Sequence, residues 1–146
     1  MLDSLAKLYD RDLLNLKKEL EEYQSESDIW LIKGEIKNSA GNICLHLVGN
    51  LNHFIGNHLG NSGYVRNRPL EFFDKDVPKE TLLNKIEATR EMLQEILPKI
   101  TDEVLRQNHT AEFQGGTNTN EYFLIHLLAH LNWHLGQVNY HRRMIN

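Results

Sequence analysis

An all-α fold, specifically a four-helix bundle, is the fold class that this sequence predicts, and three observations predict it. Apolar residues recur at three- and four-residue intervals through four separate segments, which is the spacing of one helix face. The sequence carries no strong strand signal and no internal repeat. Its 146 residues, 40% apolar and 25% charged, suit one globular domain, 1–146, with a real core.

The first two helices are expected over residues 3–24 and 38–59. In the first, apolar residues recur at near-helical spacing while Lys and Glu fill the opposite face. Residues 25–37 lose this pattern and contain Trp30, so we expect an irregular connection there. The apolar pattern resumes on one side of the second helix, which ends before a turn-rich loop, Gly60–Pro69.

The third helix is expected between Pro78 and Pro98. Proline is favoured in the first turn of a helix, and the residues that follow Pro78 form one apolar face. Residues 101–117 are expected to form a loop with one short helical turn, broken at Gly115–Gly116.

The last helix is expected over about 119–144, because Asn118 and Glu121 have the spacing of a capping box. Residues 122–141 within it, like residues 38–64 around the second helix, contain no Asp, Glu, Lys or Arg. Helices without charge on any side are expected to be buried all round. A monomer of this size rarely hides two helices completely, so we expect a homodimer.

Histidines gather in both charge-free helices. On the last helix, four fall within roughly 80° of arc: His126, His130, His134 and His141. The second helix presents a similar stripe: His46, Asn50, His53 and Asn57. If the stripes face each other, three imidazoles can converge with a fourth coordination position open, which is the catalytic arrangement of zinc. Nitrogen ligands also suit nickel or ferrous iron, so the residues leave the metal open.

Other histidines receive simpler roles. His58, His109 and His141 lie in loops or near predicted helix ends, where we expect solvent-facing or capping side chains. His53 is expected near the site or in an interface. Cys44 is expected to be a small buried apolar residue because it points about 200° away from His46 on the helix.

Several classes of protein are excluded by composition and motif. The net charge of −4 and a pI near 6.0 argue against a nucleic-acid partner. The histidines and amides of residues 122–141 argue against a membrane span, and the charged N-terminus is not a secretory signal. One cysteine fits a reducing cytoplasm. HExxH, helical ExxH and phosphate-binding glycine loops are absent.

The run HLLAHLNWHLGQVNYHRR, with LHLVGNLNHF in the preceding charge-poor helix, resembles the DinB-like (YfiT-like) superfamily of four-helix bundles. The similarity extends over nearly the whole chain. It is greatest to an uncharacterised branch that shares segments such as Gly41–Asn57 and Gly63–Phe72. The most specific part is the His-x-x-x-His-x-Gly-Gln pattern at 130–137. The resemblance implies an up-down-down-up arrangement, a divalent-metal site and, usually, a dimer.

Carried onto the matching positions, the resemblance implies the metal ligands His46, His130 and His134. It makes His126 a neighbour one turn back. Gln137 would orient a ligand or a bound water. Many relatives carry Arg where this chain has Leu135, so no charge contact is expected at that position.

Three further residues are candidates for the pocket. Asn50 lies one turn along from His46 and can line it. Arg66 and Arg68, in the loop after the second helix, are candidate contacts for a substrate carboxylate, because a guanidinium matches the geometry of that group.

Two functions, from different classes, compete at this stage. In the first, the protein is a metal-dependent transferase or hydrolase acting on a small molecule, with zinc or nickel expected and iron as an alternative. The resemblance adds a low-molecular-weight thiol as the cosubstrate of related transferases. In the second, the protein is a non-catalytic stress or interaction protein whose metal stabilises the bundle. A bundle with no metal, its histidines hydrogen-bonded internally, is a third interpretation.

Overall fold

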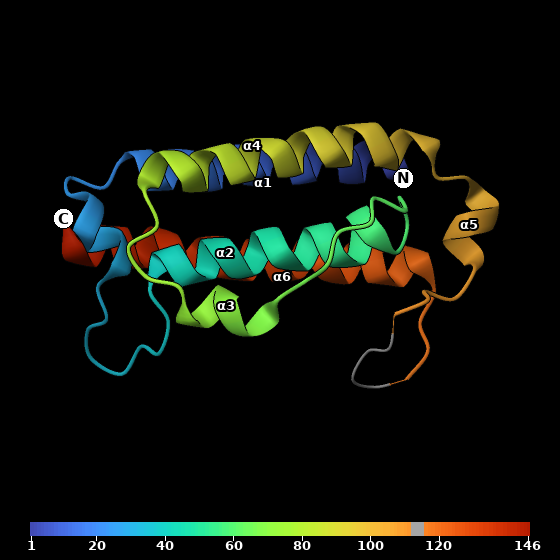
Figure 1. The fold of residues 1–146 in the computed structure, drawn as a ribbon. Coiled ribbons are helices and arrows are strands. Elements are labelled where there is room, and N and C mark those ends of the chain that lie inside the picture. The colour runs from blue at the N-terminus through green and yellow to red at the C-terminus, as the bar shows by residue number, and fades with distance from the viewer. Residues whose placement is uncertain (112–115) are drawn as a thin grey trace.

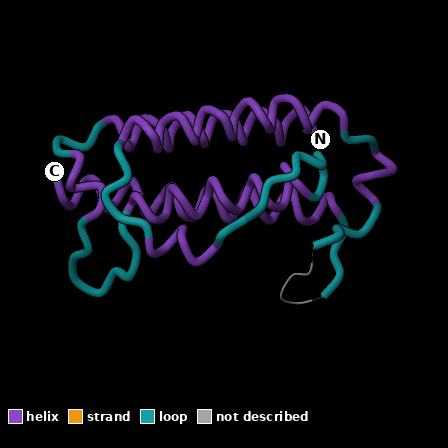
Figure 2. Tube along the Cα trace, viewed as in Figure 1, coloured by secondary structure: helices purple, strands orange, loops and turns teal. Residues whose placement is uncertain are grey.

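Four long helices lie side by side in the computed structural model of this chain (Figure 1), which describes residues 1–111 and 116–146. They are α1 Leu2–Glu21, α2 Ala40–Leu51, α4 Lys79–Ile96 and α6 Asn120–Ile145. Helices and loops make up the described chain (Figure 2), in which one isolated β-bridge joins Asn108 to Thr119. The predicted all-α bundle is confirmed. Each of the four expected helices begins and ends within three residues of its predicted bounds, if α2 is counted together with the π-helical turn Asn52–Asn57 that continues it.

The helices run up, down, down and up in chain order (Figure 1). Helix α1 packs against α4 and α6, and α2 packs against the same two helices. Helices α2 and α6 therefore lie side by side and antiparallel (Figure 1). This pairing places the two histidine-bearing segments next to each other.

Short elements fill the connections. A π-helical turn, Asn52–Asn57, continues α2, and the expected short turn between the third and last long helices is α5, Asp102–Arg106. Two further turns are 3-10 helices, Glu26–Trp30 and Leu97–Lys99. Of the predicted Gly115–Gly116 break, Gly115 lies outside the described residues.

Helix α3, Arg68–Phe73, was not predicted. It spans six residues, too few to establish an apolar period. Its start is nevertheless encoded locally: the Asn67 side chain accepts a hydrogen bond from the Leu70 amide, and Pro69 lies in the first turn. Helix α3 packs on α2 (Figure 1), a position that matters for the site below.

Burial differs between the two charge-free helices. Every residue of α2 is buried, as predicted, and Cys44 is a fully buried thiol. Helix α6 is different in the single chain, because it exposes a line of large apolar side chains: Tyr122, Ile125, Trp133, Tyr140 and Met144. The prediction of burial on every side therefore holds for α2, and not for α6 on its own.

The predicted cap of the last helix was one residue early. Thr119, not Asn118, accepts the hydrogen bond from the Tyr122 amide and begins α6. The Asn118 carbonyl is instead engaged by the His109 amide at 2.8 Å. Threonine, like asparagine, is a favoured N-cap residue, and Thr119 also pairs with Asn108 in the isolated β-bridge.

Candidate metal centre

Three histidines meet where α2 faces α6. His46 comes from α2, and His130 and His134 come from successive turns of α6. One nitrogen of each lies within 4.8 Å of the others, and the Nε2 atoms of His46 and His130 are 3.1 Å apart. His46 is buried, and the other two are partly buried. Among the described residues, this is the one cluster of His, Cys, Asp or Glu with such spacing.

Burial favours the uncharged form of the two histidines that α6 contributes to the cluster. Burial, together with the neighbouring His134 and His46, lowers the pKa of His130 to about 3. Burial also lowers the pKa of His134, against the opposing effect of its hydrogen bond to Gln137. Neutral imidazoles offer lone pairs near pH 7, and only the neutral ring can bind a metal ion. The donor set therefore fits a divalent transition-metal ion.

The outer nitrogens of two of these rings are fixed by side-chain acceptors. His46 Nδ1 donates to Glu71 Oε1 at 3.0 Å, and His134 Nδ1 donates to Gln137 Oε1 at 2.7 Å. With the proton held on Nδ1, the lone pair of each ring lies on Nε2, which is the usual second-sphere arrangement of a metal-binding histidine.

The third ring lacks such an acceptor. His130 Nδ1 is buried without a hydrogen-bond partner, and so is the side-chain oxygen of Asn50. Unpaired buried polar atoms are costly and uncommon. His130 Nδ1 can donate a hydrogen bond when it carries the proton, and the side-chain oxygen of Asn50 can accept one.

Glu71 is the residue of this centre that sequence reasoning missed. It lies on α3, is 6% exposed, and accepts two hydrogen bonds from Arg66, each 2.9 Å long. Burial opposes ionisation of the carboxyl, but hydrogen bonds from His46 and Arg66 outweigh it and lower the pKa of Glu71. A carboxylate therefore holds His46, and the guanidinium of Arg66 balances its charge.

Two residues of α2 make room for that carboxylate and hold its helix. A Cβ added at Gly49 would lie 1.9 Å from Glu71 Oε2, so a larger residue fits there only if the carboxylate moves away. The Asn42 side chain donates to the carbonyls of Glu71 and Asp74 at 3.0 and 2.9 Å. Gly56, seven residues further along, has no such close contact, because a Cβ there would meet only the side chains of Ser62 and Met92 at 3.3 Å or more.

The other predicted site residues lie at the edges of this cluster. His126 stacks beside Tyr122, with ring centroids 6.2 Å apart. Arg66 is engaged by Glu71, as described, and its guanidinium also lies 5.7 Å from the centre of the Phe54 ring. Arg68 lies over Phe72, whose ring is 5.0 Å from that of His46. Contact of either arginine with a substrate stays a prediction.

Two histidines that were expected to face solvent or cap helices are buried instead. His141 shares a hydrogen bond with the Tyr23 hydroxyl and donates to the Leu31 carbonyl, because the connection after α1 folds over the end of α6. His109 stacks on Phe123 with centroids 4.1 Å apart and donates to the Phe54 carbonyl. Both rings are fully engaged in structural hydrogen bonds.

An up-down-down-up bundle with three imidazoles between α2 and α6 defines a class: the protein has the DinB-like four-helix fold, and its histidine group can hold a divalent metal ion. Within that class, the chain belongs to the family described as protein of unknown function (DUF1572), which matches residues 5–146.

The fold has a solved relative. A crystal structure of a DinB-like protein from Bacillus cereus ATCC 10987 superimposes with a TM-score of 0.74 and 15% sequence identity, over 97% of this chain and 91% of that chain. At this identity the likeness shows the fold alone. No curated protein is significantly similar in sequence. None of the described helices is both long enough and apolar enough to cross a membrane.

Proposed function

We propose that the protein binds one divalent metal ion through His46, His130 and His134 and uses it in a transferase or hydrolase reaction on a small molecule. The observation that carries the proposal is the convergence of three imidazoles, two of which have their outer nitrogen already held by an acceptor. Three protein ligands leave a coordination position for water or substrate. Zinc or nickel is the expected ion, with iron as the alternative.

When bound, such an ion supplies a Lewis acid and lowers the pKa of a coordinated water or thiol. The chain's own groups prepare the ligands. Glu71 keeps a proton on His46 Nδ1, Gln137 does the same for His134, and Arg66 keeps Glu71 ionised. A low-molecular-weight thiol is the proposed cosubstrate for the transferase, consistent with the expectation from the DinB-like resemblance.

The first test is elemental analysis of protein purified without an affinity tag or chelator. We expect near-stoichiometric divalent metal in the wild type and little in a His130→Ala, His134→Ala variant. His126→Ala is the matched control, because His126 lies one turn back on the same helix and is expected to leave metal content unchanged. Wild type that holds no more metal than the double variant after reconstitution with zinc, nickel and iron would refute the proposal.

The alternative is that the ion only stabilises the bundle. A metal that contributes directly to folding would make chelation strongly lower the melting temperature. Metal-loaded protein would then accelerate no thiol conjugation or hydrolysis across a panel of electrophiles and biological thiols. A rate above the uncatalysed one that disappears in the double variant favours the enzyme.

We also propose that the protein forms a homodimer through the exposed face of α6. Tyr122, Ile125, Trp133, Tyr140 and Met144 are each about half or more exposed and lie on one side of the helix. No charged residue lies between positions 122 and 141, so a second copy can pack on this length of α6 without burying one of its charges. At the Met144 end, the Arg143 guanidinium lies 5.4 Å from the centre of the Tyr140 ring. A cytoplasmic location is proposed with it, because the single thiol, Cys44, is fully buried and needs no oxidising compartment.

A further inference from the structure

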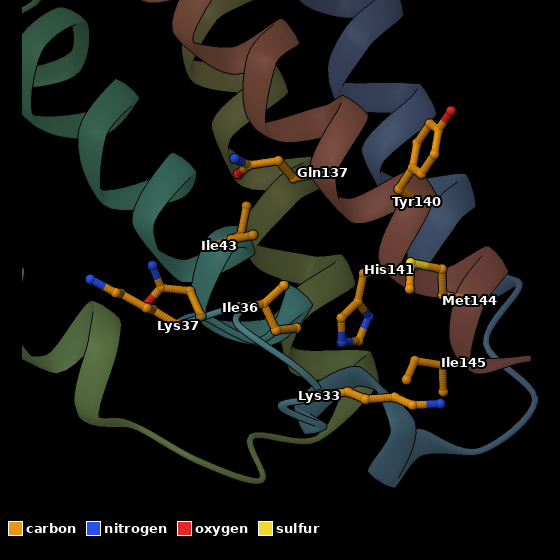
Figure 3. A pocket seen from close by; sticks show the side chains of 10 residues that line it. Lys33, Ile36, Lys37, Ile43, Gln137, Tyr140, His141, Met144 and Ile145 are labelled. Atoms are coloured by element: carbon orange, nitrogen blue, oxygen red, sulfur yellow. The ribbon is translucent and has the colours of Figure 1, made fainter.

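A cavity of about 290 Å³ lies between the end of α6 and the loop that leads into α2 (Figure 3). None of the three clustered histidines lines it. Its walls are mostly apolar, formed by Ile36, Ile43, Tyr140, Met144 and Ile145. A liquid water occupies about 30 Å³, so the cavity can hold roughly ten heavy atoms. This is the size of a small organic molecule and not of an ion or a single water.

The cavity adjoins the proposed metal ligands through both helices. Ile43 precedes His46 by three residues on α2, and Gln137 follows His134 by three residues on α6, each step being about 4.5 Å along its helix. Because the helices are antiparallel, both steps lead to the same end of the bundle (Figure 1). Gln137 belongs to both places: it lines the cavity, and its Oε1 accepts from His134 Nδ1.

The charge at the opening has one sign. Lys33 and Lys37 both line the cavity, and Figure 3 shows their side chains extending in opposite directions. No Asp or Glu lines it, and neither lysine forms an ion pair with a described residue. The histidine that lines the cavity, His141, uses both ring nitrogens in hydrogen bonds, to the Tyr23 hydroxyl and the Leu31 carbonyl. An apolar chamber with unpaired ammonium groups at its rim suits an apolar molecule that carries an anionic group.

We propose that this cavity binds the substrate of the histidine centre, and that the substrate is a small amphipathic anion. Its apolar body occupies the chamber, its anionic group lies at Lys33 or Lys37, and its reacting end lies toward Gln137 and His134. The placement of the reacting end near His134 rests on the function proposed above, whereas the binding of an amphipathic anion in the cavity does not. A second copy packed on α6 would cover the outer wall, since Tyr140 and Met144 belong to both surfaces.

The test is ligand binding to metal-free protein, followed by NMR of isoleucine and methionine methyl groups. Octanoate, with ten heavy atoms, is the probe; octyl phosphate and octyl sulfate replace the carboxylate, and octanamide removes the charge. We expect saturable octanoate binding that shifts the methyl signals of Ile36, Ile43 and Met144. We expect at least tenfold weaker binding of octanamide. Whichever anion binds most tightly identifies the anionic group.

The variants test the role of the rim. Lys33→Gln, Lys37→Gln is expected to weaken octanoate binding at least tenfold, and the two single variants assign the contact. The control, Lys7→Gln, Lys18→Gln, removes the same charge from exposed positions of α1 and should change the affinity less than twofold. Equal binding of octanamide and octanoate, unchanged binding by the rim variant, or shifts at remote methyl groups would overturn the proposal.

The link to the histidine centre has its own readout. Octanoate added to cobalt-loaded protein is expected to change the visible absorption of the ion, and to change it less in Gln137→Ala. Octanoate binding in protein that takes up no cobalt would refute the metal function and leave the cavity assignment standing. Cobalt uptake without octanoate binding would refute the cavity assignment and leave the metal function standing.

Discussion

Replacing Gly49 with alanine tests whether the Glu71 carboxylate positions His46. The added Cβ would lie 1.9 Å from Glu71 Oε2, and the carboxylate must retreat by at least about 1.5 Å to reach normal van der Waals contact. The hydrogen bond from His46 Nδ1, now 3.0 Å, does not survive a displacement of that size. His46 then loses the acceptor that fixes its tautomer and orientation.

The expected consequence is weaker metal binding with the three ligands still present. Loss of an outer-shell acceptor typically weakens metal affinity by roughly 10- to 100-fold. We expect a loss in this range for Gly49→Ala, and a similar loss for Glu71→Gln, measured by zinc competition against a chromophoric chelator. The two changes act through one contact, so the double variant should lose little more than either single variant.

The matched control is Gly136→Ala. Gly136 lies between His134 and Gln137 on α6, yet a Cβ there meets nothing within 4 Å. Alanine is favoured over glycine in a helix by about 1 kcal/mol, so this variant should keep its zinc affinity and be slightly more stable. Wild-type affinity in Gly49→Ala, or an equal loss in Gly136→Ala, would refute the role assigned to Glu71.

Three further predictions concern the rest of the molecule. Trp133→Glu places a charge on the exposed face of α6 and should convert a dimer to a monomer in light scattering, whereas Leu14→Glu, on the exposed side of α1, should not. Asn42→Ala removes the two hydrogen bonds that the Asn42 side chain donates to the carbonyls of Glu71 and Asp74, and should cost about 1–3 kcal/mol in chemical unfolding; an unchanged midpoint would argue against this tether. Burial lowers the pKa of His109 below its ordinary value of 6.5, and its Nδ1 accepts from the Ala111 amide, so the unfolded chain binds this proton more readily than the folded one. Stability of metal-free protein should therefore fall as pH drops below about 6.5, and His109→Gln should reduce that slope; an identical slope would contradict the assignment.

The bundle itself could be predicted from the sequence because its signals are local. Apolar residues at helical spacing, Pro78 at a helix start and two charge-free segments each act within a few turns of chain. The pairing of His130 with His134 is equally local, since residues four apart share a helix face. These features specify two helices that bury polar rings. The DinB-like resemblance added His46 as the third ligand beside His130 and His134.

Glu71 could not be found in this way. It lies 25 residues from His46, on a six-residue helix with no apolar period, and no spacing rule connects the two. The only local sign was Gly49, a glycine in the middle of a buried helix, where it weakens helix propensity. Its purpose becomes visible only when α3 packs on α2 and the carboxylate occupies the space of the missing Cβ.

Residue periodicity accounts for the helices, their charge-free faces and the imidazole spacing along α6, because these depend on periods of three or four residues. Helix packing brought the three imidazoles within 4.8 Å of one another, made Glu71 the carboxylate that holds His46, and placed Lys33 and Lys37 at an apolar cavity beside Gln137. The physical reason is that these contacts join α2, α3 and α6 across long separations in the chain. Their geometry is set by how whole helices pack, and not by the residues near each one in sequence.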